Sequence, residues 1–385
     1  MEKIVYAGSF DPLTNGHWWV IKSGLEIADK VLVFVAENPA KKTMFTANER
    51  KEMISQVALA EGLQDSIEVH IIKNEYVAAK ALKMGAKYMI RGIRNQIDFD
   101  AEALLQKTNT DVIGGAKTIF VMPPRDLDSV SSYFIKSLMG PVGWHIKVRQ
   151  FLPLNVYETL LKKYIYDTLM SYKSEENDVE LFELWEKTRQ AYFAKDRHYH
   201  NYEHIVHCLQ ELKWYEGNVQ KPNNYEMQQL TIAILGHDIV YAKKEDVSDE
   251  ELSAQLVQNI WSKKNIDAVA LIRTTDHLNK QTQSRNQLNF NDSKIAKLMR
   301  SIDLAILGQE PNFYKEYTKN VRKEYEDYDD LQYFAGRSKV LRGLLDKLEK
   351  DELFEHNMFK HYNEQAKINM EAELVDLSSK LNNLS

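Results

Sequence analysis

The pattern of apolar residues changes near residue 170, and this change constrains the fold more than any other feature of the chain. Before it, helical stretches alternate with short apolar runs such as KIVYAG, KVLVFVAENP, IEVHII, YMIRG and TIFVMPP. Strands that alternate with helices predict a mostly parallel, doubly wound α/β sheet. After it, apolar residues recur at helical spacing, as in LFELWEKTRQAYF and LTIAILGHDIVY, which predicts an all-α helical bundle.

The sequence therefore predicts a multidomain protein. We expect an α/β domain over residues 1–168, a polar linker over 169–179 and a helical domain over 180–385. A chain of 385 residues is longer than one hydrophobic core usually serves, which supports the same division.

Composition narrows the class of protein. No apolar run reaches membrane-spanning length, and the first residues lack the pattern of a signal peptide. The single cysteine, Cys208, fits a reducing compartment, so we expect a cytoplasmic protein without a membrane partner. The net charge of −6 consists of +2 in residues 1–170 and −8 in the remainder. Neither part has the strongly basic face of a nonspecific nucleic-acid binder, which favours a small substrate.

The stretch YAGSFDPLTNGHWW joins the first predicted strand to the first predicted helix. It places Gly16 and His17 at a helix N-terminus, where free backbone N–H groups and the helix dipole attract an anion. Glycine lets the backbone approach a phosphate, and histidine adds a donor. On this stretch alone an alternative stays open, in which Asp11-Pro12 and Asn15-Gly16 only form turns and His17 only begins the helix.

Four further stretches follow in order: ENPAKKTMFTANER, RGIRNQIDFDAE, FVMPP and SVSSYFIK. Together with GSFDPLTNGH they resemble phosphopantetheine adenylyltransferase, a coenzyme A biosynthesis member of the T/H-x-G-H nucleotidyltransferase superfamily, over about residues 3–164. The resemblance implies a Rossmann-like fold that transfers AMP from ATP, bound with Mg²⁺, to a substrate phosphate and releases pyrophosphate. Catalysis would then depend on positioning and charge stabilisation.

The resemblance also implies roles for individual residues. The catalytic set would be His17, which stabilises the reacting phosphate, with Lys42, Arg91 and Ser132. The other ATP- and substrate-binding residues would be Gly8, Ser9, Phe10, Thr14, Gly16, Gly92, Arg94, Glu102, Ser131 and Lys136. For Glu102 the alternative is a plain carboxylate on a helix surface.

The chain departs from this family pattern on the acceptor side. Family members usually read S-S-S where this chain has Ser131-Ser132-Tyr133, and KNEYVAAKAL lacks the apolar pair associated with pantetheine contact. Trp18 and Trp19 either pack the first helix or reshape the acceptor pocket. Adenylylation of some phosphorylated, phosphopantetheine-like acceptor is therefore better supported than adenylylation of phosphopantetheine itself.

The second half places histidine and aspartate in apolar helical surroundings, in DRHYHNYEHIVHC, LGHDIVY and SIDLAILG. The pair His237-Asp238 is costly inside an apolar helix unless something compensates it, and Asp303 raises the same problem. A divalent metal held with His204 would compensate all of them. The alternative is a buried histidine that is hydrogen-bonded to its neighbour.

The order His204, His237-Asp238, Asp303 is the H…HD…D pattern, and residues 181–354 resemble predicted metal-dependent HD-superfamily phosphohydrolases. The resemblance implies an HD-domain bundle that hydrolyses a phosphoester of a nucleotide-like substrate, with these four residues as metal ligands. A divalent Mn, Fe, Co or Mg ion suits such ligands. His200 and His277 are then expected to line the pocket and contact the substrate phosphate.

Together the two resemblances predict a bifunctional enzyme, with a homo-oligomer formed through the N-terminal domain. Two alternatives stay open. One domain is a catalytically weak ligand sensor that regulates the other, or the acceptor is a different phosphorylated metabolite or a nucleic-acid end, although the acidic second half argues against nucleic acid.

Overall fold

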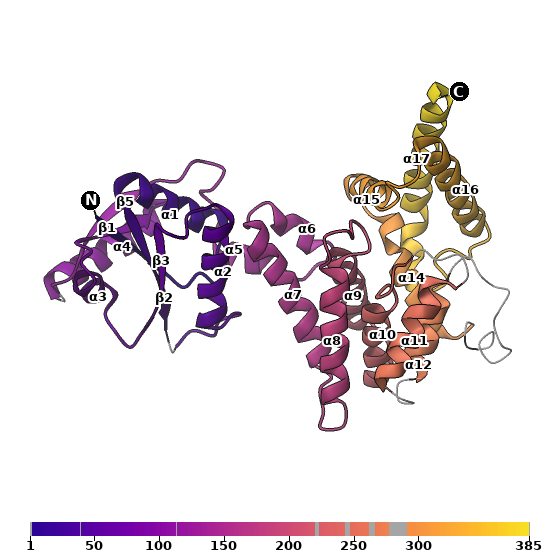
Figure 1. Ribbon diagram of the computed structural model, residues 1–385, viewed down its shortest axis with the longest axis horizontal. Helices are drawn as coiled ribbons and strands as arrows, with labels where there is room; N and C mark the ends of the chain where they lie inside the picture. Colours follow the sequence, from indigo (N-terminus) through magenta and orange to yellow (C-terminus); the bar gives the residue numbers. More distant parts are fainter. Residues whose placement is uncertain are drawn as a thin grey trace. The chain divides into compact units, whose positions relative to one another are not determined.

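The computed structural model describes residues 2–38, 40–112, 114–219, 223–242, 247–261, 266–276, 290 and 292–384 (Figure 1). The chain divides into two compact units, Met1–Leu160 and Leu161–Ser385. The division falls inside one helix, α7 (Leu154–Met170), and not in the predicted linker over 169–179. The assignment of that segment as a domain linker stays a prediction.

The first unit is built on one sheet of five parallel strands. The strands are β1 (Lys3–Gly8), β2 (Lys30–Glu37), β3 (Ile67–Lys73), β4 (Tyr88–Gly92) and β5 (Lys117–Val121). Their order is β3-β2-β1-β4-β5, with Val5 paired to Leu32 and to Met89. The predicted parallel α/β sheet is confirmed. In this order the crossovers reverse direction between β1 and β4, and such a switch point opens a crevice at the carboxyl ends of the strands.

Helices of the first unit connect these strands or, in the case of α5 and α6, follow the last one. They are α1 (Asn15–Ile27), α2 (Ala47–Ala60), α3 (Val77–Lys83), α4 (Gln96–Lys107), η1 (Thr108–Val112), α5 (Ser132–Leu138) and α6 (Trp144–Arg149). The apolar runs predicted as strands form the core, where Val5, Leu32 and Phe34 are fully buried. Helix α4 differs from the others because it buries no residue, and Ile97 on it is 80% exposed.

The second unit is helical throughout the part that the structure describes. Its elements are α8 (Asp178–Tyr192), α9 (Tyr202–Asn218), α10 (Asn224–Gly236), α11 (Asp249–Trp261), α12 (Ile266–Thr274), α14 (Lys294–Asp303), η2 (Leu304–Gly308), α15 (Pro311–Glu324), α16 (Asp330–Glu349), η3 (Asn357–Tyr362) and α17 (Asn363–Leu384). The core runs through α10, where Ile232, Ile234 and Leu235 are fully buried. The predicted largely helical region is confirmed. None of the described helices is long and apolar enough to cross a bilayer.

Candidate functional sites

A pocket of about 590 Å³ opens in the first unit at the carboxyl ends of β1 and β4. All but two of the residues predicted for this unit line it: Gly8, Ser9, Gly16, His17, Lys42, Arg91, Gly92, Arg94, Glu102, Ser131, Ser132 and Lys136. The exceptions are Phe10 and Thr14, which lie behind the pocket wall. Phe10 is fully buried, with its ring edge-to-face to the ring of His17 at 5.3 Å between centroids.

His17 stands in the first turn of α1, held by the residue that caps this helix. The backbone N–H of Thr14 donates to Nδ1 of His17 at 3.1 Å, and the Thr14 hydroxyl lies 2.9 Å from the same nitrogen. Burial, and then the charge of Arg94, lower the pKa of His17 to about 4. The imidazole is therefore neutral at pH 7. Because Nδ1 accepts a hydrogen bond, the ring proton resides on Nε2, which makes Nε2–H a donor.

Glycine is required at position 16 because α1 begins close to another segment. A Cβ atom built on Gly16 would lie 2.9 Å from the backbone oxygen of Val130, closer than real contacts allow. The turn thus brings the start of α1 against the residues that precede α5, and this contact narrows one side of the pocket.

Basic side chains surround the pocket, and several are held by carboxylates. Arg91 donates to Glu102 at 2.8 Å and to the backbone oxygen of Ala7, while Arg94 pairs with Asp98 at 2.7 Å. Glu102 thus faces the pocket, where it orients Arg91. Lys42 is exposed, and within the described part of the chain it forms no ion pair. It is available to an incoming anion.

From the sequence, Asp11 was considered only as part of a turn, but in the structure its carboxylate contacts three other residues. Its carboxylate accepts the backbone N–H groups of Met44 at 2.9 Å and Phe45 at 2.8 Å, and it pairs with Lys136. Asp11 is only 3% exposed. It therefore ties the loop that carries Lys42 to the motif turn and to α5. The sequence shows only an acidic residue in a turn, and the structure was needed to show that it is buried and which groups it contacts.

The two serines at the start of α5 form different hydrogen bonds. Ser131 caps this helix by accepting the N–H of Phe134 at 3.1 Å, and Ser132 donates to the backbone oxygen of Pro12 at 2.8 Å. Tyr133, which replaces the third serine of the family pattern, lines the pocket and is 83% exposed.

The two tryptophans do not line this pocket. They border a separate cavity of about 430 Å³, where the indole N–H of Trp18 donates to Glu61 at 2.7 Å. Trp18 is buried and packs α1 against the first unit, outside the lining of the 590 Å³ pocket.

Comparisons with known proteins agree with this geometry. The sequence profile of the cytidylyltransferase-like family matches residues 5–159. Phosphopantetheine adenylyltransferase of Chromobacterium violaceum is 38% identical over 164 residues, which are 43% of this chain and 98% of that enzyme. The N-terminal part of this chain belongs to the phosphopantetheine adenylyltransferase family. The phosphopantetheine adenylyltransferase of Neisseria meningitidis serogroup C is 32% identical over 166 residues, 43% of this chain and 96% of that enzyme.

In the second unit, four predicted side chains converge from three parts of the chain. His204 lies on α9, His237 and Asp238 follow α10 directly, and Asp303 ends α14. Nε2 of His204 lies 3.1 Å from Nε2 of His237, 3.5 Å from the Asp238 carboxylate and 3.4 Å from that of Asp303. Nε2 of His237 lies 3.0 Å from Asp238 and 3.4 Å from Asp303. Atoms that ligate one ion at about 2.1 Å are themselves roughly 3.0–3.4 Å apart, so the donor set fits a metal.

The tautomer of His237 also suits a metal ligand. Its Nδ1 lies 2.8 Å from the backbone oxygen of Ile234 and donates to it, so Nε2 is the nitrogen that faces the cluster. Burial opposes ionisation of Asp238, but the neighbouring His237 and His200 hold its pKa well below the usual range. Burial opposes protonation of His237, but the Asp238 carboxylate holds the pKa of this imidazole well above its usual range, so an ion bound here would have to displace that proton before Nε2 could ligate it.

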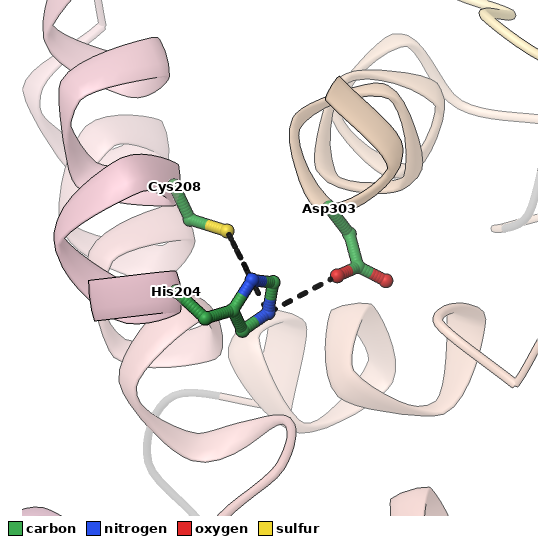
Figure 2. A group of neighbouring side chains, drawn as sticks. All are labelled: His204, Cys208 and Asp303. Carbon is green, nitrogen blue, oxygen red and sulfur yellow. Dashed lines mark hydrogen bonds and ion pairs between the residues drawn. The ribbon is translucent and has the colours of Figure 1, made fainter. Parts of the chain in front are cut away.

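Cys208 is a neighbour that the sequence did not place here (Figure 2). It is fully buried one turn after His204 on α9, and its Sγ lies 3.8 Å from each ring nitrogen of His204. Its sulfur lies within 4.8 Å of ligand atoms of His204 and Asp303. The i, i+4 spacing of His204 and Cys208 was the sequence signal for this proximity.

His200 lies beside this cluster, and the structure shows what holds it. Its Nδ1 lies 2.7 Å from the carboxylate of Glu324, at the end of α15. Burial opposes ionisation of Glu324, but hydrogen bonds from His200 and Tyr199 lower its pKa to about 2. No sequence pattern pointed to Glu324. His277, the other predicted substrate contact, lies outside the described residues.

Proposed function

We propose that the N-terminal unit transfers AMP from ATP to a phosphorylated, phosphopantetheine-like acceptor and releases pyrophosphate. The observation that carries this proposal is the neutral His17, whose Nε2–H is a fixed donor in a pocket lined by Lys42 and two arginines. Such a donor stabilises negative charge on the oxygens of the reacting phosphorus as it becomes five-coordinate. The family of the N-terminal part supports the same reaction.

The residues around His17 have complementary tasks. Arg91 and Arg94, held by carboxylates, present planar guanidinium groups to phosphate oxygens, while Lys42, which forms no ion pair with any described residue, supplies a mobile point charge. The free N–H groups at the start of α1 add hydrogen bonds to the same anion. ATP would enter with its Mg²⁺, which is part of the substrate.

The reaction is tested by incubating the protein with ATP, Mg²⁺ and a panel of phosphorylated acceptors, followed by mass spectrometry of the products. An adenylylated acceptor and pyrophosphate are expected in equal amounts. Lys42→Ala should weaken turnover, whereas Lys51→Ala, an exposed lysine on α2, serves as the matched control. If no acceptor in the panel yields an adenylylated product, the proposal fails.

We further propose that the second unit is an HD-type, metal-dependent phosphohydrolase acting on a nucleotide-like phosphoester. The observation that favours it is the convergence of His204, His237, Asp238 and Asp303. A divalent Mn, Fe, Co or Mg ion held there would lower the pKa of a water molecule and polarise a phosphoryl oxygen. His204, His237, Asp238 and Asp303 would hold that ion.

Elemental analysis of the purified protein, paired with a screen of nucleotide phosphoesters, tests this second function. About one or two divalent ions per chain are expected together with phosphate release. A protein that holds the ion and binds a nucleotide but releases no phosphate would instead support the alternative of a sensor domain.

We also propose that the first unit pairs with a second copy of the chain through α4. This helix buries none of its residues within its own unit, and Ile97, Phe99 and Leu104 on it are exposed. Contact with a second copy would cover this apolar surface.

A further inference from the structure

The pair His237-Asp238 lies in a turn that follows a helix, and the turn itself does little to fix it. Helix α10 ends at Gly236, so the backbone groups of the next residues lose the regular partners that a helix supplies. The N–H of Ile239 reaches the backbone oxygen of Gly236 only at 3.4 Å. The position of Asp238 therefore depends on contacts with other parts of the chain.

The side chain of Arg197 binds the carbonyl side of this turn. Its Nη1 donates to the backbone oxygen of Asp238 and its Nη2 to that of Ile239 at 2.8 Å. Nη1 also donates to the backbone oxygen of His200 at 3.2 Å, in the same segment before α9. Two successive carbonyl groups are thus held by the two ends of one planar guanidinium group, a geometry that a lysine cannot reproduce.

The charge of Arg197 is not used on a carboxylate. Within the described ranges of the chain this guanidinium forms no ion pair. It lies over the ring of Tyr192 at 5.2 Å and over that of Tyr241 at 5.6 Å, measured to the ring centroids. Carbonyl dipoles and aromatic faces therefore compensate the cation, and its hydrogen bonds are spent on backbone oxygens.

Tyr192 binds the opposite side of the same peptide segment. Its hydroxyl accepts the N–H of Asp238 at 3.1 Å, and the side chain is fully buried on α8. The N–H and the carbonyl of Asp238 are thus both bonded, from two different segments. The carboxylate that these bonds direct lies 3.0 Å from Nε2 of His237 and 3.5 Å from Nε2 of His204.

We propose that Arg197 and Tyr192 are positioning residues, which fix the backbone of Asp238 so that its carboxylate faces a divalent ion held with His204, His237 and Asp303. This inference rests on the proposed metal-dependent phosphohydrolase function. It assigns to two residues that ligate nothing a part of the affinity of the site for its ion. Replacement of groups that orient metal ligands costs about 10- to 100-fold in metal affinity.

Mn²⁺ binding to the full-length, metal-free protein tests this role, with the free ion measured by electron paramagnetic resonance. Arg197→Lys keeps the positive charge but cannot hold both carbonyl groups, so the Kd for Mn²⁺ should rise about tenfold or more. Tyr192→Phe keeps the ring beneath Arg197 and removes only the acceptor of the Asp238 N–H, and a rise of similar size is expected. Thermal unfolding without metal shows that each variant folds.

Arg322→Lys is the matched control. Arg322 on α15 likewise donates to two backbone oxygens, those of Tyr325 at 2.7 Å and Tyr328 at 3.1 Å, and lies over a tyrosine ring. These contacts do not involve the His-Asp turn. The control should lose thermal stability, as Arg197→Lys does, and keep its Kd for Mn²⁺ within about twofold of the wild-type value.

The outcomes separate this inference from the function on which it rests. A folded variant that loses stability but binds Mn²⁺ as tightly as the wild type would reduce its residue to a structural role and overturn the proposal for it. If Arg197→Lys does not fold, Tyr192→Phe decides. An equal loss of affinity in Arg322→Lys would also overturn the proposal, because the effect would not be specific to the turn. Wild-type protein that binds no Mn²⁺ would instead overturn the metal-dependent function, and the positioning role with it.

Discussion

Replacement of His17 by alanine should separate catalysis from binding in the N-terminal unit. The side chain supplies one fixed Nε2–H donor, and loss of one such donor to a developing charge lowers kcat by about 10²–10³-fold, or roughly 3–4 kcal/mol. In the variant, the phosphates of bound ATP would still have Lys42, Arg91, Arg94 and the N–H groups of α1 as partners. The Kd for ATP should therefore change by less than about tenfold.

The structural cost of the same change is small enough for the protein to fold. The backbone N–H of Thr14 loses its acceptor, and Phe10 loses an edge-to-face contact. Together these losses amount to roughly 2 kcal/mol, a fraction of the stability of an ordinary domain. The half of the capping box in which the His17 N–H donates to Thr14 remains.

Single-turnover pyrophosphate release and ATP titration, performed on the same samples, measure the two effects. His70→Ala is the matched control, because His70 is a partly buried histidine on β3 outside the pocket lining. It should leave kcat within about twofold of the wild-type value. A His17→Ala protein that turns over as fast as the wild type would refute the role of Nε2. If that protein also bound ATP more weakly, His17 would contribute only to ground-state binding.

Three further perturbations test other parts of the structure. Because burial, and then the charge of Arg94, lower the pKa of His17 to about 4 in the folded state, the unfolded state binds more protons at this residue below pH ~6.5. The stabilising contribution of His17 is present above that pH and is lost toward pH 4. The free energy of unfolding in urea titrations should therefore fall by up to about 3 kcal/mol more in the wild type than in His17→Ala, beyond the fall that carboxylates such as Glu324 cause in both proteins. Tyr133→Ser should raise kcat/KM for phosphopantetheine relative to the wild type, since the exposed ring lines the pocket; an unchanged value would exclude Tyr133 from acceptor choice. Asp238→Asn should remove the metal, and its ATP affinity at the first unit should stay within about twofold of the wild-type value. The control Asp267→Asn, on α12, should keep the metal in elemental analysis. Equal metal content in the wild type and in Asp238→Asn would contradict the ligand assignment.

Local patterns in the sequence were sufficient for the architecture of each half. Strands of the first unit are continuous apolar runs because a parallel sheet is buried on both faces, and the helices of the second unit repeat apolar residues at helical spacing. The motif around His17 could be predicted as an anion site because a strand, a glycine-rich turn and a helix are consecutive in the chain. The family of the N-terminal part follows from the same consecutive stretches. The residues of the His-Asp cluster around His204 could also be named in advance, since polar groups in apolar helices require compensation.

Only the tertiary structure determined which partners these residues have. Asp11 contacts the loop after β2 and Lys136 on α5, and Glu324 contacts the loop before α9, across separations of more than thirty and more than a hundred residues. Such contacts leave no periodic trace in sequence because each depends on how whole helices and strands pack. The same holds for Trp18, whose pairing with Glu61 directs it away from the pocket. The tautomers of His17 and His237 depend on a backbone N–H and a backbone oxygen only three residues away, but the direction of each ring became known only from the coordinates. The sequence determines which functional groups are present, and the packing of the chain determines which atoms of these groups face a ligand.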